Sequence, residues 1–270
     1  MFRSRHHSAH ILPVPTRHAR RWPFDWSDGL VAVIIMGTYF LSRWFIWGGA
    51  VAAFHHARQL LALEHTLGIA PEAAMQQLGL QHLWLQNGAD ILYLAAHLPL
   101  VIGIAFWLRW HHPAAYRWYR TALLGTAAIC FVIFIIYPVA PPRFLPGFVD
   151  GVKDVGFDVD TSIFSSLYNP YAAMPSLHMS WALLNGWALA SYASSRWLKL
   201  LGLLWPLVMT LVVLITGNHF MLDVLAGVLV GVVAGLASYA WQRHTQLRLV
   251  PPQSQPIPAP AGIIPSTAAE

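Results

Sequence analysis

Apolar residues gather in six segments along the chain, and polar residues separate them. A helix needs about 20 mostly apolar residues to cross a membrane. Segments close to that length lie at 29–48, 89–108, 120–140, 178–195, 198–216 and 220–241. The first contains Arg43, and the second contains Asp90 and His97, so these two are less apolar than the third, fifth and sixth. The pattern predicts an all-α membrane protein, a six-transmembrane-helix bundle.

Residues 53–87, between the first two predicted spans, are too polar to cross a membrane. Leu60, Leu63 and Leu67 follow helical spacing, and the stretch Gly68-Ile69-Ala70-Pro71 then interrupts the helix. This pattern predicts two short amphipathic helices that lie on the outer leaflet of the membrane.

The six spans form the predicted central unit of the chain, residues 29–241. Residues 1–28 are basic and polar, and we predict a cytoplasmic N-terminal segment there. Residues 242–270 are rich in proline and poor in charge towards their end, which predicts a disordered cytoplasmic tail. Within the sixth span, Gly227, Gly231 and Gly235 are spaced four apart, which predicts close approach of another helix and no chemistry.

Composition and charge support a multi-pass membrane protein, and we expect it in a bacterial inner or plasma membrane. The chain is 57% hydrophobic and 10% charged, with a mean hydropathy of +0.52, whereas soluble domains carry about 25% charged residues. The pI of about 9.6 could suggest a nucleic-acid partner. However, twelve of the sixteen basic residues fall on one predicted side of the membrane. By the positive-inside rule, that distribution places both termini in the cytoplasm, and we expect no nucleic acid.

Three polar residues far apart in the sequence are predicted to meet at the outer face. Arg143 follows the outer end of the third span, His178 opens the fourth, and His219 lies at the outer start of the sixth. Asp223 follows His219 by four residues, so both share one helix face. A carboxylate there can fix the imidazole tautomer and leave the other ring nitrogen free to attack. A lone histidine at a span end is usually an interfacial residue, so this hypothesis depends on the convergence.

The same residues are suited to holding a phosphate. Arg143 can bind two phosphate oxygens, and the first turn of the fourth span, at Ser176 and Leu177, offers N–H groups to an anion. His178 is then placed to protonate a leaving oxygen. Asp223 within an apolar span would cost at least about 2.5 kcal/mol unless paired, which favours a functional role.

Three motifs resemble those of the type 2 phosphatidic acid phosphatase (PAP2) superfamily. They are Pro141-Pro142-Arg143, Ala172-Ala173-Met174-Pro175-Ser176-Leu177-His178, and Thr216-Gly217-Asn218-His219 continuing to Asp223. The chain is most similar to the inositolphosphotransferase branch, which is related to inositol phosphorylceramide synthase. The resemblance covers about residues 30–240, and extends more loosely to Glu64, Leu67-Gly68-Ile69, Glu72, Asn87, Tyr93 and His97.

The resemblance implies a mechanism that needs no metal or cofactor. His219 would form a phosphohistidine and Asp223 would orient it. His178 would serve as the acid for the departing alcohol and then as the base for the acceptor. Arg143 and Ser176 would bind phosphate, with help from backbone N–H groups near Leu177.

Some positions depart from the usual superfamily motifs. Ile136 and Val213 stand where a lysine and an arginine are usual, Phe144 replaces a proline, and Leu177 often corresponds to glycine. These departures fit the synthase-like branch but leave fewer cations for phosphate. Arg43 or Lys153 could compensate, although Arg43 fits a span-end residue equally well.

Asn87, Tyr93, His97 and Arg43 are candidates for a pocket that binds a head group or acceptor alcohol. The alternative for the first three is an interhelical hydrogen-bond network, and both interpretations stay open. We therefore expect an enzyme that hydrolyses or transfers the phosphoryl or phospho-head group of a lipid phosphate at the extracytoplasmic face. The alternatives are a plain phosphatase for phosphatidate or isoprenyl diphosphate, and a non-catalytic membrane transporter.

Overall fold

The computed structural model describes residues 49–150 and 169–249, with a few isolated positions between 29 and 45. Within these residues the regular elements are helices, and the sole β-bridge pairs Val139 with Ala172. The all-α prediction is therefore confirmed for the described part of the chain. The predicted first span, Arg43, Lys153, residues 1–28 and the end of the tail lie outside it, apart from those isolated positions.

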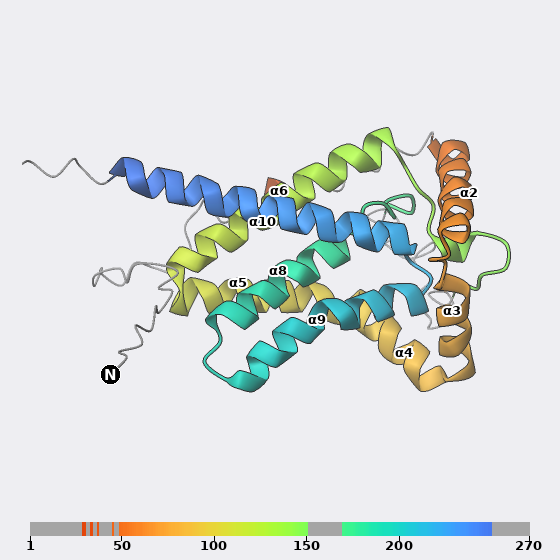
Figure 1. Ribbon diagram of the computed structural model, residues 1–270, viewed down its shortest axis with the longest axis horizontal. Helices are drawn as coiled ribbons and strands as arrows, with labels where there is room; N and C mark the ends of the chain where they lie inside the picture. The colour runs from red at the N-terminus through yellow and green to blue at the C-terminus, as the bar shows by residue number, and fades with distance from the viewer. Residues whose placement is uncertain are drawn as a thin grey trace, which may run out of the picture.

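The helices form a long bundle that is crossed at one end by two further helices. In Figure 1, α5, α6, α8, α9 and α10 run along the long axis, while α2 and α3 stand across the end of the bundle. The elements are α2 (Ala50–Leu67), α3 (Glu72–Gln81), α4 (Leu83–Ile91), the π-helical η2 (Leu92–Ala96), α5 (His97–His111), α6 (Pro113–Ile136), the 3₁₀ turn η3 (Pro142–Phe144), α8 (Leu177–Tyr192), α9 (Arg196–Ile215) and α10 (Met221–Leu249).

Four helical stretches are long and apolar enough to span a membrane: Leu83–His111, Pro113–Ile136, Arg196–Ile215 and Met221–Thr245. They correspond to the second, third, fifth and sixth predicted spans. The predicted fourth span is α8, whose 16 residues fall short of the usual span length. The six-span count therefore stays a prediction, as does the position of α2 and α3 at the membrane surface.

Prolines explain why the third span begins and ends earlier than predicted. Pro113 starts α6 at its first turn, a position where the missing N–H costs nothing. At the other end, Tyr137 precedes Pro138 and is forced away from helical geometry, so α6 ends at Ile136 and not near 140.

A π-helical segment joins α4 to α5 and ends three residues before Pro99. Proline has no N–H to donate to the carbonyl of Ala95, and its ring would clash with that carbonyl. The widened turn of η2 absorbs this conflict. The residues buried along the continuous stretch share one inward face, and they are Gln86, Ala89, Asp90, Tyr93, His97, Val101, Ile104 and Leu108.

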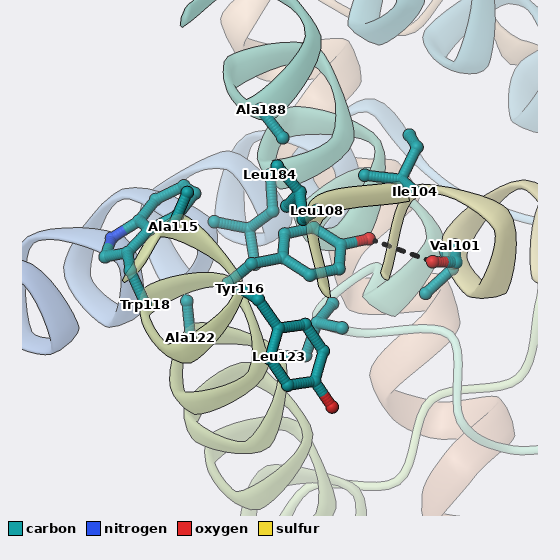
Figure 2. Close-up of a cluster of buried hydrophobic side chains, with 11 residues drawn as sticks. Val101, Ile104, Leu108, Ala115, Tyr116, Trp118, Ala122, Leu123, Leu184 and Ala188 are labelled. Atoms are coloured by element: carbon teal, nitrogen blue, oxygen red, sulfur yellow. Dashed lines mark hydrogen bonds between the residues drawn. The ribbon is translucent and has the colours of Figure 1, made fainter. Parts of the chain in front are cut away.

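The main apolar core lies where α5, α6 and α8 meet, away from α2 and α3. Figure 2 shows its side chains, including Val101 and Leu108 of α5, and Leu184 of α8. The Tyr119 hydroxyl lies within this core and donates to Asn185 Oδ1. The outward faces are also apolar, since Leu203, Leu207 and Leu229 are each more than half exposed. Leucines on the outside suit helices surrounded by lipid.

The glycine stripe of α10 allows close contact with α8, as the sequence predicts. A Cβ on Gly227 would lie 2.4 Å from the carbonyl oxygen of Ser176, and one on Gly231 would lie 3.2 Å from that of Ser180. Ser180 Oγ also donates to the Gly227 carbonyl at 2.8 Å. This packing holds the start of α8 beside α10, which positions the candidate site.

Candidate active site

The three motifs meet at one end of the bundle and are joined by main-chain hydrogen bonds. Val139 N donates to Tyr171 O at 2.9 Å, and Ala173 N donates to Val139 O at 3.2 Å, so the first motif's loop pairs with the second's. Arg143 N donates to Gly217 O at 2.9 Å, which joins the first motif to the third. The convergence predicted from topology is therefore present in the fold.

A further main-chain hydrogen bond fixes the second motif to the third. Ser176 N donates to the main-chain oxygen of Asp223 at 3.0 Å. Gly217 turns the chain between α9 and His219 with a φ of +63°, which favours glycine, and a Cβ there would meet Gln76 Nε2 at 2.5 Å. The turn before His219 is thus tightly enclosed.

His219 is buried, and one of its ring nitrogens is held by the second motif. Its Nδ1 lies 2.8 Å from the main-chain oxygen of Ala173. A carbonyl can only accept, so this contact fixes the proton on Nδ1 and leaves the lone pair on Nε2. Within the described residues Nε2 has no hydrogen-bond partner. His219 therefore has the tautomer that a nucleophilic imidazole needs.

Asp223 lies on the same side of the ring, at a longer distance than Ala173. Its Oδ2 is 3.5 Å from His219 Nδ1 and accepts a shorter hydrogen bond, 2.9 Å, from Phe220 N. The carboxylate is fully buried. The predicted contact between His219 and Asp223 is present, but His219 precedes α10, so the two do not share a helix face, and Ala173 makes the closer contact with the imidazole. Asp223 is placed to stabilise positive charge on that ring.

His178 lies between His219 and two aromatic residues of the α4–η2–α5 stretch. Its ring centroid is 6.0 Å from that of His219, 4.8 Å from that of His97, and 4.2 Å from that of Tyr93, on which it stacks. Tyr93 also meets His219 edge to face at 6.5 Å. Three histidines therefore lie in a row in space at the site, with His178 between His97 and His219.

His97 is as buried as His219, since each is 3% exposed. Its side chain is buried, and within the described residues neither ring nitrogen has a hydrogen-bond partner. It lies close to His178 and stacks at 6.2 Å on Trp181. The structure therefore brings Tyr93 and His97 to the site, as the sequence suggests.

Asn87 does not join them, because its side chain is exposed. The polar neighbours that point inward on the same stretch are Gln86 and Asp90, whose side chains are hydrogen-bonded at 3.1 Å. Gln86 could have been predicted from its spacing, because it shares one helix face with Asp90, Tyr93 and His97.

Ser176 and Leu177 form the start of α8. Ser176 is the N-cap residue, and its Oγ accepts a hydrogen bond from Met179 N at 3.2 Å. Its own N–H is already used by Asp223. The N–H groups of Leu177 and His178 precede the intrahelical ladder, so they are the ones available for an anion.

Arg143 is buried beside the turn that carries His219. Its Nε lies 3.3 Å from Asp150 Oδ1, and its guanidinium lies 4.8 Å from the centre of the Phe144 ring. A Cβ on Gly217 would be 3.4 Å from that of Arg143, so Arg143 packs directly on the third motif. In this arrangement Asp150 contacts the guanidinium group that the sequence analysis predicts to bind phosphate.

A small open pocket lies at the junction of the three motifs. Asn218, which the sequence interpretation left unassigned, lines it and donates to Thr216 Oγ1 at 2.7 Å. Its lining residues are Tyr93, Pro141, Pro170, Ala172, Ala173, Asn218 and His219.

No metal site accompanies these groups in residues 49–150 and 169–249. No three histidine, cysteine or acidic side chains within those ranges are grouped to hold an ion. The side chains gathered here are the imidazoles of His97, His178 and His219, the Asp223 carboxyl group and the Arg143 guanidinium.

Comparisons with known proteins identify one family. A family model described as PAP2 superfamily matches residues 58–237. A search of the curated proteins found no match. Among solved structures, a crystal structure of LpxE from Aquifex aeolicus is similar with a TM-score of 0.41 and 19% identity, covering 57% of this chain and 82% of that one. That similarity is too weak to carry an argument.

Proposed function

Because the chain belongs to the PAP2 superfamily, we propose that it is a membrane enzyme acting on a lipid phosphate through a phosphohistidine on His219. One observation carries the proposal. The imidazole of His219 is held through Nδ1 by Ala173, at the junction of three motifs, while Nε2 has no partner within the described residues. A buried imidazole in that state is prepared for nucleophilic attack.

The proposed reaction has two steps. In the first, His219 Nε2 attacks phosphorus, and the bond from phosphorus to the lipid oxygen breaks. His178 gives a proton to that oxygen, and Asp223 stabilises the cationic imidazole. In the second, His178 takes a proton from water or an alcohol, whose oxygen displaces the histidine and regenerates it. Arg143 and the N–H groups of Leu177 and His178 hold the phosphoryl oxygens.

For phosphate to bind, Arg143 must turn from Asp150 at least in part. A guanidinium has five donors, so Arg143 can keep one contact to a carboxylate while offering others to phosphate. The remaining charge stabilisation comes from the α8 N-terminus. No metal or cofactor is assigned a role in this scheme.

The acceptor decides between hydrolysis and transfer, and we propose transfer, as in the inositolphosphotransferase branch. The first and third motifs lack the usual lysine and arginine. These departures fit the synthase-like branch and so support transfer. Plain hydrolysis of phosphatidate or an isoprenyl diphosphate is the second candidate. We place the reaction on the extracytoplasmic face with both termini in the cytoplasm, since the basic residues favour that topology.

A panel of lipid phosphates tests the proposal with purified protein in detergent or nanodiscs. We expect phosphate release from at least one member, with lipid products that change when inositol or another polyol is added. Release unaffected by any alcohol would favour the plain phosphatase. No turnover with any lipid phosphate, together with solute flux in liposomes that persists in His219→Ala, would favour the transporter.

Replacing His178 with glutamine should separate the two steps. With a lipid substrate, loss of the proton donor should lower turnover by about 10²- to 10⁴-fold. An aryl phosphate such as 4-nitrophenyl phosphate has a leaving group that needs no proton. The variant should therefore release a rapid burst of nitrophenolate and then turn over slowly, because the phosphohistidine persists. Stopped-flow absorbance measures the burst, and equal loss with both substrates would contradict the role of His178.

A further inference from the structure

The two helices that cross the end of the bundle carry two buried glutamates to the start of α10. Glu64 of α2 is 0% exposed and Glu72 of α3 is 1% exposed. Glu64 Oε1 accepts from Leu222 N at 2.5 Å, and Glu72 Oε1 accepts from Met221 N at 2.7 Å. Each glutamate is about 150 residues away in the sequence from the residue whose N–H it accepts. Neither glutamate takes part in the reaction proposed above.

These hydrogen bonds satisfy N–H groups in the first turn of α10, the helix that carries Asp223, which have no acceptor within the helix. The first N–H groups of a helix lack intrahelical acceptors, and acidic groups are favoured near them. Phe220 N already donates to Asp223, so Glu72 and Glu64 take the next two. His219 directly precedes this set of hydrogen bonds. A shift in any of them would move His219 relative to Ala173 and the α8 N-terminus.

The α2–α3 pair is built to hold these carboxylates in place. Gly68 ends α2 in the left-handed conformation, and Ile69 N returns to Glu64 O at 2.9 Å. α3 is fixed in turn by Gln76, whose amide makes two hydrogen bonds with the main chain of Val149, at 2.8 and 2.9 Å. Residues 50–81 are therefore fastened both to α10 and to the loop that follows Arg143.

We propose that Glu64 and Glu72 are positioning residues that fix the His219–Asp223 turn, and that holding these carboxylates is the role of α2 and α3. The inference rests on the proposed function, since it assigns a catalytic consequence to the position of His219. A purely structural role would affect folding alone. A positioning role affects turnover in protein that is folded.

The protonation of Glu64 adds a specific expectation. Burial, with smaller contributions from the nearby carboxylates of Glu72 and Asp223, raises the pKa of Glu64 to about 9. The charged and titratable groups at this place are Glu64 from α2, Glu72 from α3, and Asp223 with its neighbour His219 from the α10 end. Glu64 is thus a neutral carboxylic acid at pH 7. Glutamine has the same shape and also keeps an oxygen for Leu222 N.

Four variants of the full-length protein in nanodiscs test the proposal: Glu64→Ala, Glu72→Ala, Glu64→Gln and Glu72→Gln. Each alanine variant should lower kcat by about tenfold or more, the usual cost of removing an outer-shell support, with KM little changed. Glu64→Gln should recover most of the loss at position 64. Trp118→Phe is the matched control, since it removes a buried hydrogen bond to Gly235 O far along the chain. It should lower thermal stability without lowering kcat.

A second readout needs no substrate and therefore separates this inference from the proposed function. The ¹⁵N imidazole signal of His219, identified by its loss in His219→Ala, should shift in both alanine variants and stay unchanged in Trp118→Phe. A wild-type protein without phosphatase activity would defeat the proposed function, and the His219 signal would still decide the positioning role. An unmoved signal, or kcat within twofold of wild type in both alanine variants, would overturn the inference.

Stability against pH provides a test if the alanine variants do not fold. Glu64 has a pKa of about 9 when folded against an ordinary value of 4.5. The folded state therefore binds more protons between these values, and the contribution of Glu64 to the free energy of unfolding declines as pH rises from about 4.5 to about 9. Glu64→Gln cannot titrate, so its thermal midpoint should depend less on pH over this range. An identical pH dependence in wild type and Glu64→Gln would overturn the proposed arrangement of the carboxylates.

Discussion

His219→Ala is expected to abolish both lipid-phosphate turnover and the covalent phosphoenzyme. Without Nε2 no P–N bond can form, and loss of a nucleophile lowers turnover by about 10⁴-fold or more. The measurement is phosphate release together with ³²P labelling of the protein, quenched in alkali because phosphohistidine is acid-labile. His65→Ala is the matched control, since His65 is exposed on α2 at the same end of the protein. It should keep both activities.

Asp223→Asn gives a graded comparison for the same centre. The substitution keeps the shape but removes the charge 3.5 Å from His219 Nδ1. By analogy with triads in which the orienting carboxylate is neutralised, turnover should fall by about 10²- to 10⁴-fold. Because Ala173 O still holds Nδ1, some phosphoenzyme should remain. Labelling of His219→Ala equal to wild type would show that the nucleophile lies elsewhere.

Gly227→Ala is expected to reduce both stability and activity, whereas Gly235→Ala should not. Alanine stabilises a helix by about 1 kcal/mol relative to glycine, but overpacking costs about 1–3 kcal/mol. At Gly227 the added Cβ would lie 2.4 Å from Ser176 O, so overpacking dominates. At Gly235 the nearest atom is Leu184 Cδ2 at 3.4 Å, an ordinary contact, so the helix preference dominates. Thermal or denaturant unfolding of both variants measures the difference.

The effect of Gly227→Ala on activity follows from the position of Ser176. Ser176 caps α8 and donates to Asp223 O, so moving it separates His178 from His219. A misplacement of about 1 Å can cost about 10²-fold in rate. The two glycines differ by two helical turns on one face, which makes them a matched pair. Equal stability and equal turnover in the two variants would contradict the close packing of α8 on α10.

The extent of the helices could be predicted from the sequence wherever apolar length controls it. Four stretches meet the length and hydropathy of a membrane span, since lipid requires a long apolar segment whose backbone bonds are satisfied internally. Their ends were less accurate because prolines determine them, as at Pro113 and Pro138. The fourth predicted span corresponds to α8, whose 16 residues are fewer than a span usually needs, so its crossing of the membrane stays a prediction. Hydropathy indicates that such a segment is buried, but a core helix can be equally apolar.

The candidate site could be predicted only as far as side chains carry a signal. His178, His219, Asp223 and Arg143 were identifiable because charged and imidazole groups at span ends are few. The contact of Ala173 O with His219 was not, because every residue has a carbonyl and its direction depends on the loop. Asn87 was predicted for the pocket and Gln86 was not, although Gln86 shares a helix face with Asp90 and Tyr93, four and seven residues further on.

The sequence by itself determined that this is a helical membrane protein with two histidines and a carboxylate at the ends of apolar segments. Composition and spacing suffice for that, because they act within single helices. Only the tertiary structure decided that Ala173 holds His219, that Asp150 contacts Arg143, and that Glu64 and Glu72 support the start of α10. These contacts join residues remote in sequence, and their geometry is set by how the helices pack.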